Sequence, residues 1–237
     1  MNRPDQPKVD AESNSGAAIV AMVADDARSR LLRAALRLFA EQGYSKTSTR
    51  ELAEAAKVNV ASISYYFGDK AGLYRAAFFE PLGEPGDEAA QLECAGRSGL
   101  HKLLHTFYAI FLDPLRNGEA AQLCIKLRFR EILEPTGLWD EEVNKGIKPM
   151  HDTLVALLAR QFGLTGPDLE LHRLVTSLAG LGVQVHVCRD ITDRIAPGLN
   201  DQPDSVDLWI QRLTGYAMAM VQGEAARRGL KLRGPVL

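Results

Sequence analysis

A short run beginning at Asn59 combines small side chains with hydroxyl groups, a mixture suited to contacts with a nucleic acid. Hydroxyl and amide groups can hydrogen-bond phosphates and base edges. Small apolar side chains let the backbone approach a duplex, and a methyl group can touch thymine. The run therefore favours recognition of double-stranded DNA. Its members are Asn59, Val60, Ala61, Ser62, Ser64, Tyr65 and Tyr66.

Patterns typical of catalysis do not occur in the sequence. It contains no GxSxG, P-loop, HExxH or GxGxxG motif. The stretch Gly180-Leu181-Gly182 lacks a third glycine, and Glu141 and Glu142 fall on a charged stretch typical of a solvated helix face. We predict that the protein is not an enzyme. A helical enzyme that processes a small molecule and an interaction module that does not bind DNA remain the alternatives.

The histidines and cysteines do not form a metal-binding pattern. His101 and His105 share one helix face, but nothing nearby completes a ligand set. His186 and Cys188 are two residues apart and point in different directions on a helix. The chain has three widely spaced cysteines, which predicts neither a disulfide framework nor a zinc knuckle. We expect no metal, no cofactor and a reducing, cytoplasmic location.

The first residues predict neither export nor a membrane span. The longest early apolar run, residues 17–24, is far shorter than the roughly 20 residues that a helix needs to cross a bilayer. Asp10 and Glu12 precede it and Asp25 follows it, unlike the basic start of a signal peptide. Residues 1–24 are predicted to form a disordered arm, and no membrane partner is expected.

Charge is unevenly distributed along the chain, whose net charge is -2. From Asp25 to Arg75, nine Lys and Arg stand against six Asp and Glu, a balance of +3; the other residues carry 19 against 24, a balance of -5. A basic N-terminal unit suits contact with phosphates, although uneven charge is also common on solvated surfaces.

The spacing of apolar residues predicts the helices that would position the run of residues 59–66. The first apolar stripe repeats at three- and four-residue steps and stops at Gly43. Ser48 and Glu51 form a capping box for the next helix, and Asp69 can cap the fourth. The expected helices cover residues 26–42, 48–57, 60–67 and 69–79.

A cluster of proline and glycine over residues 81–86 predicts a domain boundary. Beyond it the pattern stays helical, and Pro149 is expected to kink or divide one of the later helices. These later helices are expected over residues 97–116, 119–133, 139–162, 168–192 and 204–228.

The second and third helices are short and joined tightly, which is typical of a helix-turn-helix. In this motif the second helix enters the major groove. Val58, Ile63 and Phe67 would pack inward, and Asn59 can cap the helix. The small and hydroxyl-bearing residues then lie on the outer face.

These segments resemble the TetR/AcrR family of transcriptional regulators. Residues 31–44, LLRAALRLFAEQGY, are similar to the family's first helix, and residues 47–53, TSTRELA, to its second. Residues 65–74, YYFGDKAGLY, are similar to the junction of its third and fourth helices. The resemblance implies an all-α fold: an N-terminal three-helix helix-turn-helix DNA-binding domain and a C-terminal helical ligand-binding and dimerisation domain. We assign residues 25–80 and 81–237 to them.

The family pattern also implies roles for particular residues. Arg50 matches a phosphate or base contact at the start of the second helix, and the run from Asn59 to Tyr66 matches the recognition helix. Lys70 matches a lysine that meets phosphate at the start of the fourth helix, where free backbone N–H groups also favour anions.

The chain departs from the common family pattern at four positions. Many relatives have glycine where Lys57 and Ala61 stand, tyrosine at Ser64 and histidine at Tyr66. Lys57 is expected either in a left-handed turn, at a cost of roughly 1 kcal/mol, or in a turn that differs slightly from that of the relatives. Ser64 changes which base contacts are available.

The YbiH/CecR-like branch of the family is more similar to this chain. The likeness rests on residues 59–68, NVASISYYFG, and more faintly on residues 126–131, KLRFRE, and 147–151, IKPMH. We identify the chain as resembling this branch.

The C-terminal helices carry more apolar residues than one buried stripe needs. By resemblance to the family, the last two helices form a dimer interface, and a two-fold dimer implies a palindromic operator. Internal core packing is the alternative, because sequence does not separate self from partner contacts. The expected interface residues are Leu174, Leu178, Leu181, Val185, Leu213, Tyr216, Ala217, Met220 and Val221.

A small-molecule effector site is expected in the same domain, because ligand pockets are mostly apolar with a few convergent polar groups. Each candidate is also of a type common in cores or on surfaces, and together they do not indicate the chemical class of the effector. The candidates are Phe107, Phe111, Arg128, Glu131, Trp139, Met150, His151, His186 and Arg189. The resemblance thus implies a homodimeric regulator, expected to be a repressor that an unidentified small molecule releases from its operator, and the sequence leaves the choice between repression and activation open.

Overall fold

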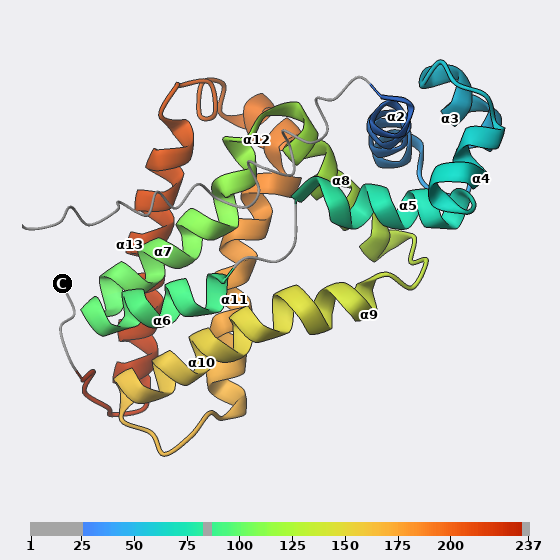
Figure 1. The fold of residues 1–237 in the computed structure, drawn as a ribbon. Coiled ribbons are helices and arrows are strands. Elements are labelled where there is room, and N and C mark those ends of the chain that lie inside the picture. The colour runs from blue at the N-terminus through green and yellow to red at the C-terminus, as the bar shows by residue number, and fades with distance from the viewer. Residues whose placement is uncertain (1–25, 83–86, 234–237) are drawn as a thin grey trace, which may run out of the picture.

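The computed structural model describes residues 26–82 and 87–233, and all regular elements within these ranges are helical. This confirms the predicted all-helical fold. The predicted disordered arm, residues 1–24, lies outside the described residues. Figure 1 shows the N-terminal helices gathered at one end of the molecule, beside a bundle of longer helices.

The N-terminal unit follows the predicted helices closely. Its first helix begins where the Asp26 side chain accepts a hydrogen bond from Ser29 N at 2.7 Å, and it ends at Gly43, whose φ is 84°. Leu31, Phe39 and other apolar side chains form a buried core between the helices. The elements are α2 Ala27–Gln42, α3 Thr49–Ala55, α4 Ala61–Phe67 and α5 Lys70–Phe79.

The C-terminal part consists of longer helices joined by short turns. Its helices are α6 Glu88–Ser98, α7 Leu100–Leu112, α8 Gly118–Leu133, α9 Trp139–Glu142, α10 Lys148–Phe162, α11 Leu169–Val187, α12 Arg189–Ile195 and α13 Ser205–Arg227. Two 3₁₀ turns, Glu80–Leu82 and Asp113–Leu115, and a π-helical turn, Val143–Ile147, complete the described elements.

Three boundaries differ from the sequence prediction. Helix α6 was not predicted, because only Leu92 and Ala95 of its residues are buried and its apolar stripe is therefore weak. Gly99, with φ of 127°, separates it from α7. The predicted helix 139–162 is divided at the π-helical turn, so that Pro149 falls in the first turn of α10, where proline is tolerated. Cys188 divides the predicted helix 168–192 into α11 and α12.

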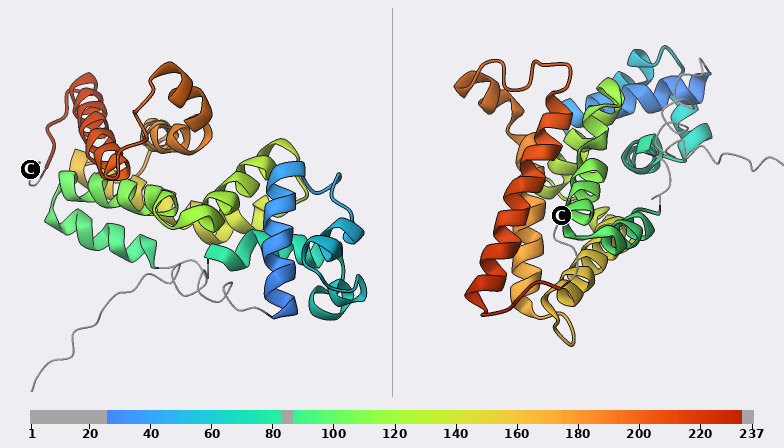
Figure 2. Two further views of the ribbon diagram at one scale, coloured as in Figure 1. Left: turned by 90° about the horizontal axis from the view of Figure 1, so that it is seen from above. Right: turned by 90° about the vertical axis from the view of Figure 1, so that its left-hand side faces the viewer.

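Helix α8 packs against the N-terminal helices although it lies beyond the predicted domain boundary. Cys124 and Leu127 belong to the same buried cluster as the side chains of α2 to α5. Arg130 donates from Nη2 to the carbonyl oxygen of Glu41 at 2.9 Å and from Nε to that of Ala40 at 3.3 Å. The end of α2 is therefore held by α8, and both views in Figure 2 show the two helices side by side.

A second core lies between α7, α10, α11 and α13. Tyr108 is buried in it and donates from Oη to the carbonyl oxygen of Leu178 at 3.0 Å. Helix α13 runs along the outside of this bundle and packs mainly on α7 (Figure 2). Burying one such leucine or tyrosine contributes about 2 kcal/mol, so the bundle has ample apolar area to fix its helices.

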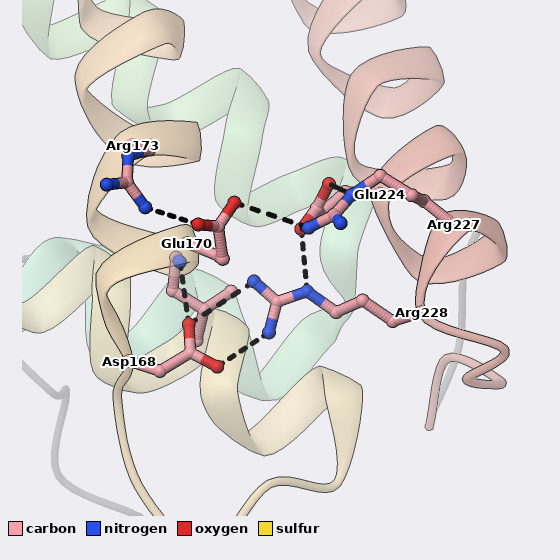
Figure 3. Close-up of polar contacts among 7 residues, drawn as sticks. Asp168, Glu170, Arg173, Glu224, Arg227 and Arg228 are labelled. Carbon is pink, nitrogen blue, oxygen red and sulfur yellow. Dashed lines mark hydrogen bonds and ion pairs between the residues drawn. The ribbon is translucent and has the colours of Figure 1, made fainter.

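An ion-pair network ties the start of α11 to the end of α13 (Figure 3). Arg228 donates to Asp168 at 2.7 Å and to Glu224 at 2.6 Å. Arg227 pairs with Glu224 at 2.7 Å, and Glu170 accepts from both Arg227 and Arg173. Asp168 also caps α11 through Leu171 N at 2.9 Å, so the network fixes a helix end as well as a helix pair.

Candidate DNA-binding surface and ligand cavity

The turn between α3 and α4 has the geometry of a helix-turn-helix. Ser48 Oγ accepts from Glu51 N at 3.2 Å while Glu51 Oε2 accepts from Ser48 N at 2.9 Å, the predicted capping box. Lys57 adopts φ of 54°, the left-handed turn expected from its departure from glycine. Asn59 Oδ1 accepts from Ala61 N at 2.9 Å, but the N-cap of α4 is Val60, which makes no side-chain cap, so Asn59 stands one residue before the predicted cap position.

Helix α4 buries one side and exposes the other. Ile63 is buried, and Phe67 lies half-buried beneath the Arg28 guanidinium, 5.0 Å from the ring centroid. On the opposite side Tyr65 is 81% exposed and its ring packs edge-on against that of Tyr66. Exposed residues of the predicted contact surface are Arg50, Asn59, Val60, Ala61, Ser64, Tyr65 and Tyr66; Ser62 and Lys70 are half-buried.

The junction into α5 is tight. Gly68 has φ of 80°, and Asp69 caps α5 by accepting from Gly72 N at 2.8 Å. A Cβ at Gly72 would lie 2.0 Å from the Phe67 carbonyl oxygen, so only glycine fits there. Lys70 stands at the helix start with its Nζ 4.3 Å from the centroid of the Tyr44 ring. The arrangement offers backbone N–H groups and a cation next to the recognition helix, a combination suited to phosphate.

A cavity of about 1040 Å³ lies between the N-terminal helices and the bundle. Its N-terminal wall includes Tyr66 and Phe67 at the end of α4, and Arg75 and Phe79 of α5. Its other walls come from α6, α7, α8, and the turn between α9 and α10. Three of the predicted ligand residues line this cavity: Phe111, Arg128 and Met150.

The other predicted ligand residues do not line this cavity. His151 and His172 lie side by side with Nε2 and Nδ1 2.9 Å apart, and His186 Nε2 lies 3.0 Å from the carbonyl oxygen of Phe111. Arg189 pairs with Asp193 at 3.9 Å. The residues outside the cavity are Phe107, Glu131, Trp139, His151, His186 and Arg189.

Glu131 instead joins the two parts of the chain. It is fully buried and its Oε2 accepts from Tyr74 Oη of α5 at 2.7 Å. Its Oε1 accepts from Thr136 N at 2.6 Å, Thr136 Oγ1 at 2.9 Å, Gly137 N at 3.1 Å and Leu138 N at 3.3 Å. Burial, together with the hydrogen bond to Glu131, raises the pKa of Tyr74 above its ordinary range. The carboxyl group thereby fixes α8 to α5 and to the turn before α9.

Arg128 is the most buried cation of the cavity wall. It forms an ion pair with Glu142, and its guanidinium lies 5.1 Å from the centroid of the Phe78 ring. Burial lowers the pKa of Arg128 to about 10, so the side chain stays protonated at neutral pH. At the rim, Arg75 and Lys145 both pair with Glu141 and lower the pKa of that carboxyl group to about 2.

Sequence reasoning missed the cavity residues that come from the DNA-binding unit and, apart from Phe111, those of α7. The sequence pattern indicates only DNA contact for Tyr66 and core packing for Phe67, and no periodicity shows that the end of α4 also faces the bundle. His105, which shares a helix face with His101, lines the cavity, and burial lowers its pKa. Within the described ranges, no cluster of three or more His, Cys, Asp or Glu could hold a metal ion.

The predicted dimer residues divide into two groups. The larger group lies in the core of the single chain, where it packs against neighbouring helices and has little surface left for a partner. Tyr216 is exposed, and Leu181 and Met220 are half-buried. The buried members are Leu174, Leu178, Val185, Leu213, Ala217 and Val221.

None of the helices in the described part of the chain is both long enough and apolar enough to span a bilayer.

Two family models match the chain. The model of bacterial regulatory proteins of the tetR family matches residues 31–77. The model of the C-terminal domain of the HTH-type transcriptional dual regulator CecR matches residues 100–224. The matches fall on the N-terminal helices and on the bundle that carries most of the cavity wall.

Individual proteins agree with these matches. CecR of Shigella flexneri is 30% identical over 165 residues, which cover 64% of this chain and 73% of the relative. The probable regulator YttP of Bacillus subtilis (strain 168) is 41% identical over 66 residues, 27% of this chain and 32% of the relative. The crystal structure of HlyIIR, a hemolysin II transcriptional regulator, shares the fold with a TM-score of 0.54 at 20% identity, over 79% of this chain and 97% of that one.

These relatives are transcriptional regulators and not enzymes, which agrees with the sequence prediction. The CecR match also confirms the predicted branch. The chain belongs to the TetR family of transcriptional regulators, with a C-terminal domain of the CecR type.

Proposed function

We propose that this regulator is a cytoplasmic homodimeric repressor that binds a palindromic operator and leaves it when a small molecule occupies the cavity. The observation that carries the proposal is that α4 contributes both to the exposed surface and to the wall of the cavity. Its outer face, with Tyr65, is exposed for a major groove, while Tyr66 and Phe67 at its end line the cavity. A ligand in the cavity would therefore touch the recognition helix itself.

Release of the operator follows from a population shift. A ligand changes the balance between two arrangements only by its different affinity for each, and a hundredfold preference corresponds to about 2.7 kcal/mol. The ligand contacts α4 and α5 on one side and α7 and the turn before α10 on the other, so its affinity depends on how the two parts are spaced. Two recognition helices whose spacing changes no longer match successive major grooves.

A partner subunit would use the exposed side of α11 and α13. Gly180 of α11 and Gly215 and Ala219 of α13 are small and exposed, and α13 also carries the exposed ring of Tyr216. Small residues let helices of two subunits approach closely, and a shared face of this kind suits a two-fold dimer. The same symmetry supports a palindromic operator.

Tyr65→Ala tests the DNA-binding surface. A duplex is first selected from random sequence with the purified protein, and its affinity is measured by fluorescence anisotropy at several salt concentrations. We expect the variant to lose about 1–3 kcal/mol of binding free energy with unchanged thermal stability, because the side chain contacts DNA and not the core. The affinity of the parent protein should fall steeply as salt rises, in proportion to the phosphates neutralised.

Leu133→Ala is the matched control. Leu133 is 83% exposed, comparable to Tyr65, but lies at the end of α8. The Leu133→Ala variant should bind the selected duplex with the same affinity as the parent protein. Equal affinity of the Tyr65→Ala and Leu133→Ala variants would remove Tyr65 from the contact surface, and failure to retain any sequence-selective duplex would overturn the operator proposal.

A further inference from the structure

Two buried glutamates near the cavity are held very differently. Glu131 accepts five hydrogen bonds from Tyr74 and the following turn. Glu142, with a side chain only 10% exposed, has Arg128 as its hydrogen-bonding partner in the described part of the chain. Buried carboxylates are normally satisfied by several donors, because an unsatisfied charge is costly to bury. Glu142 therefore has fewer protein hydrogen bonds to lose than Glu131 when another carboxylate competes for its place.

Arg128 has unused hydrogen-bonding capacity in the same place. A guanidinium presents five N–H donors in a planar fork that matches a carboxylate with two parallel bonds. Here Nη1 donates to one oxygen of Glu142, while the buried Nε has no partner among the described residues. Arg128 lines the cavity, so a carboxylate that enters from the cavity could satisfy more of the fork than Glu142 does.

The backbone beside Glu142 gives that side chain room to leave. It directly precedes the π-helical turn Val143–Ile147, and such turns are frequent at functional sites. Gly146 of this turn faces the carboxyl group: a Cβ there would lie 3.3 Å from Glu142 Oε1. Val143 and Ile147 of the turn are exposed, so few packing contacts hold it in place.

The rest of the cavity suits an apolar body. Phe79, Ile110, Phe111 and Met150 supply aromatic and aliphatic walls, and Lys102 is one of several further cations that line the cavity besides Arg128. A cavity of about 1040 Å³ accommodates a molecule of drug size. The kind of molecule that fits is therefore defined by three features: the guanidinium of Arg128, the apolar walls and the replaceable carboxylate of Glu142.

We propose that the cavity binds a small carboxylic acid with an apolar body, whose carboxylate replaces Glu142 on Arg128. This inference rests on the proposed effector function and gives the effector its chemical class. Glu142 acts as a resident competitor that closes the site in the free protein. When the ligand displaces it, the π-helical turn is released from α8, which changes the wall that faces α4.

The test uses phenylbutanoate and octanoate as probes, each compared with its primary amide, and measures binding to the full chain by calorimetry at pH 7. We expect the acids to bind roughly tenfold or more tightly than the amides, because only the acids form charged bonds with Arg128. Arg128→Met should lose the preference for the acids. Glu142→Gln should tighten acid binding several-fold, because the competing charge is gone.

Arg128→Met and Glu142→Gln should change the affinity for the acids in opposite directions. This distinguishes the proposed role from a structural one, because loss of a purely structural ion pair would weaken acid binding in both variants. Glu134→Gln is the matched control: it removes a carboxylate of an ion pair with Arg130 on the same helix, outside the cavity, and should change nothing. Equal binding of acids and amides, or Glu142→Gln that does not tighten acid binding, overturns the proposal. So does the absence of acid binding to both the parent and Glu142→Gln at about 1 mM, the weak end of specific affinity.

Operator binding is measured on the same samples. If the parent selects a duplex but binds no acid, the carboxylate inference fails while the repressor proposal stands. If the acids bind as expected but no duplex is selected, the operator proposal fails while the carboxylate site stands.

Discussion

Replacing Glu131 by alanine should uncouple the N-terminal helices from the bundle. The variant removes both carboxyl oxygens and with them all five hydrogen bonds. It leaves the buried hydroxyl of Tyr74 without its acceptor, and the backbone N–H groups of residues 136–138 lose theirs. An unsatisfied buried group costs about 1–3 kcal/mol, but the turn is exposed and water can reach part of it. We therefore expect a loss of about 3–5 kcal/mol in the free energy of unfolding.

Two milder variants measure separately how much each carboxyl oxygen of Glu131 contributes to the free energy of unfolding. Tyr74→Phe removes only the 2.7 Å bond to Oε2 and should cost about 1.5–3 kcal/mol. Glu131→Gln keeps one oxygen for the turn and places an N–H group against the Tyr74 oxygen, so it should cost about 1–2 kcal/mol. Tyr74 and Glu131 share a hydrogen bond, so their effects on stability should not add. The double variant of Tyr74→Phe and Glu131→Gln should lose less free energy of unfolding than the sum of the two single losses, by roughly 1 kcal/mol.

Urea unfolding followed by circular dichroism measures these differences. Glu134→Gln provides the control, since its partly exposed ion pair with Arg130 should be worth less than about 1 kcal/mol. The reasoning fails if Glu131→Ala costs no more than this control, or if the Tyr74 and Glu131 variants prove additive. In either case the five contacts would not hold the two parts of the chain together.

Two further predictions concern the turn and the ion network. Lys57→Gly should raise the free energy of unfolding by roughly 1 kcal/mol, because φ of 54° is strained for lysine and free for glycine; urea unfolding checks this, and a less stable variant would contradict it. Hydrogen bonding from Arg227 lowers the folded-state pKa of Glu224 to about 2, below its ordinary value of 4.5. Because the charged carboxylate thus stabilises the fold, Glu224→Gln should lower the free energy of unfolding by about 1 kcal/mol near neutral pH. That contribution is present above pH 4.5 and is lost as pH falls towards 2, so the difference between parent and variant in urea unfolding should shrink over this range; a difference that is constant with pH would exclude the ion pairs as its source.

The N-terminal unit could be predicted from sequence because its determinants are local. The capping box of Ser48 and Glu51 and the cap at Asp69 each depend on residues within one helical turn. The left-handed turn at Lys57 followed from the family pattern and is confirmed by its φ of 54°. Such features can be recognised from neighbouring residues alone, although the short helices that carry them are held by packing against other helices.

The cavity could not be predicted in the same way, because its walls come from segments far apart in the chain. Arg128, Phe111 and Met150 were chosen for their residue types, and the same reasoning selected His151 and Arg189, which lie elsewhere. Residue type does not distinguish a carboxyl group that fixes a turn, as Glu131 does, from one that faces a cavity. Only the distances to donors on other helices make that distinction.

The dimer residues illustrate what periodicity can and cannot assign. Apolar residues at three- and four-residue steps correctly indicate that α13 is buried, but a helix with apolar residues on more than one side has more than one neighbour. Leu213, Ala217 and Val221 pack on the helices of their own chain, whereas Tyr216, one position from Ala217, points outward. A side chain that is already fully buried gains nothing from a second subunit, because burial stabilises only in proportion to the area removed from water. The energy of any dimer on this face must therefore come from Tyr216, from the half-buried Leu181 and Met220 and from the small exposed residues, and not from the buried leucines that periodicity selects first.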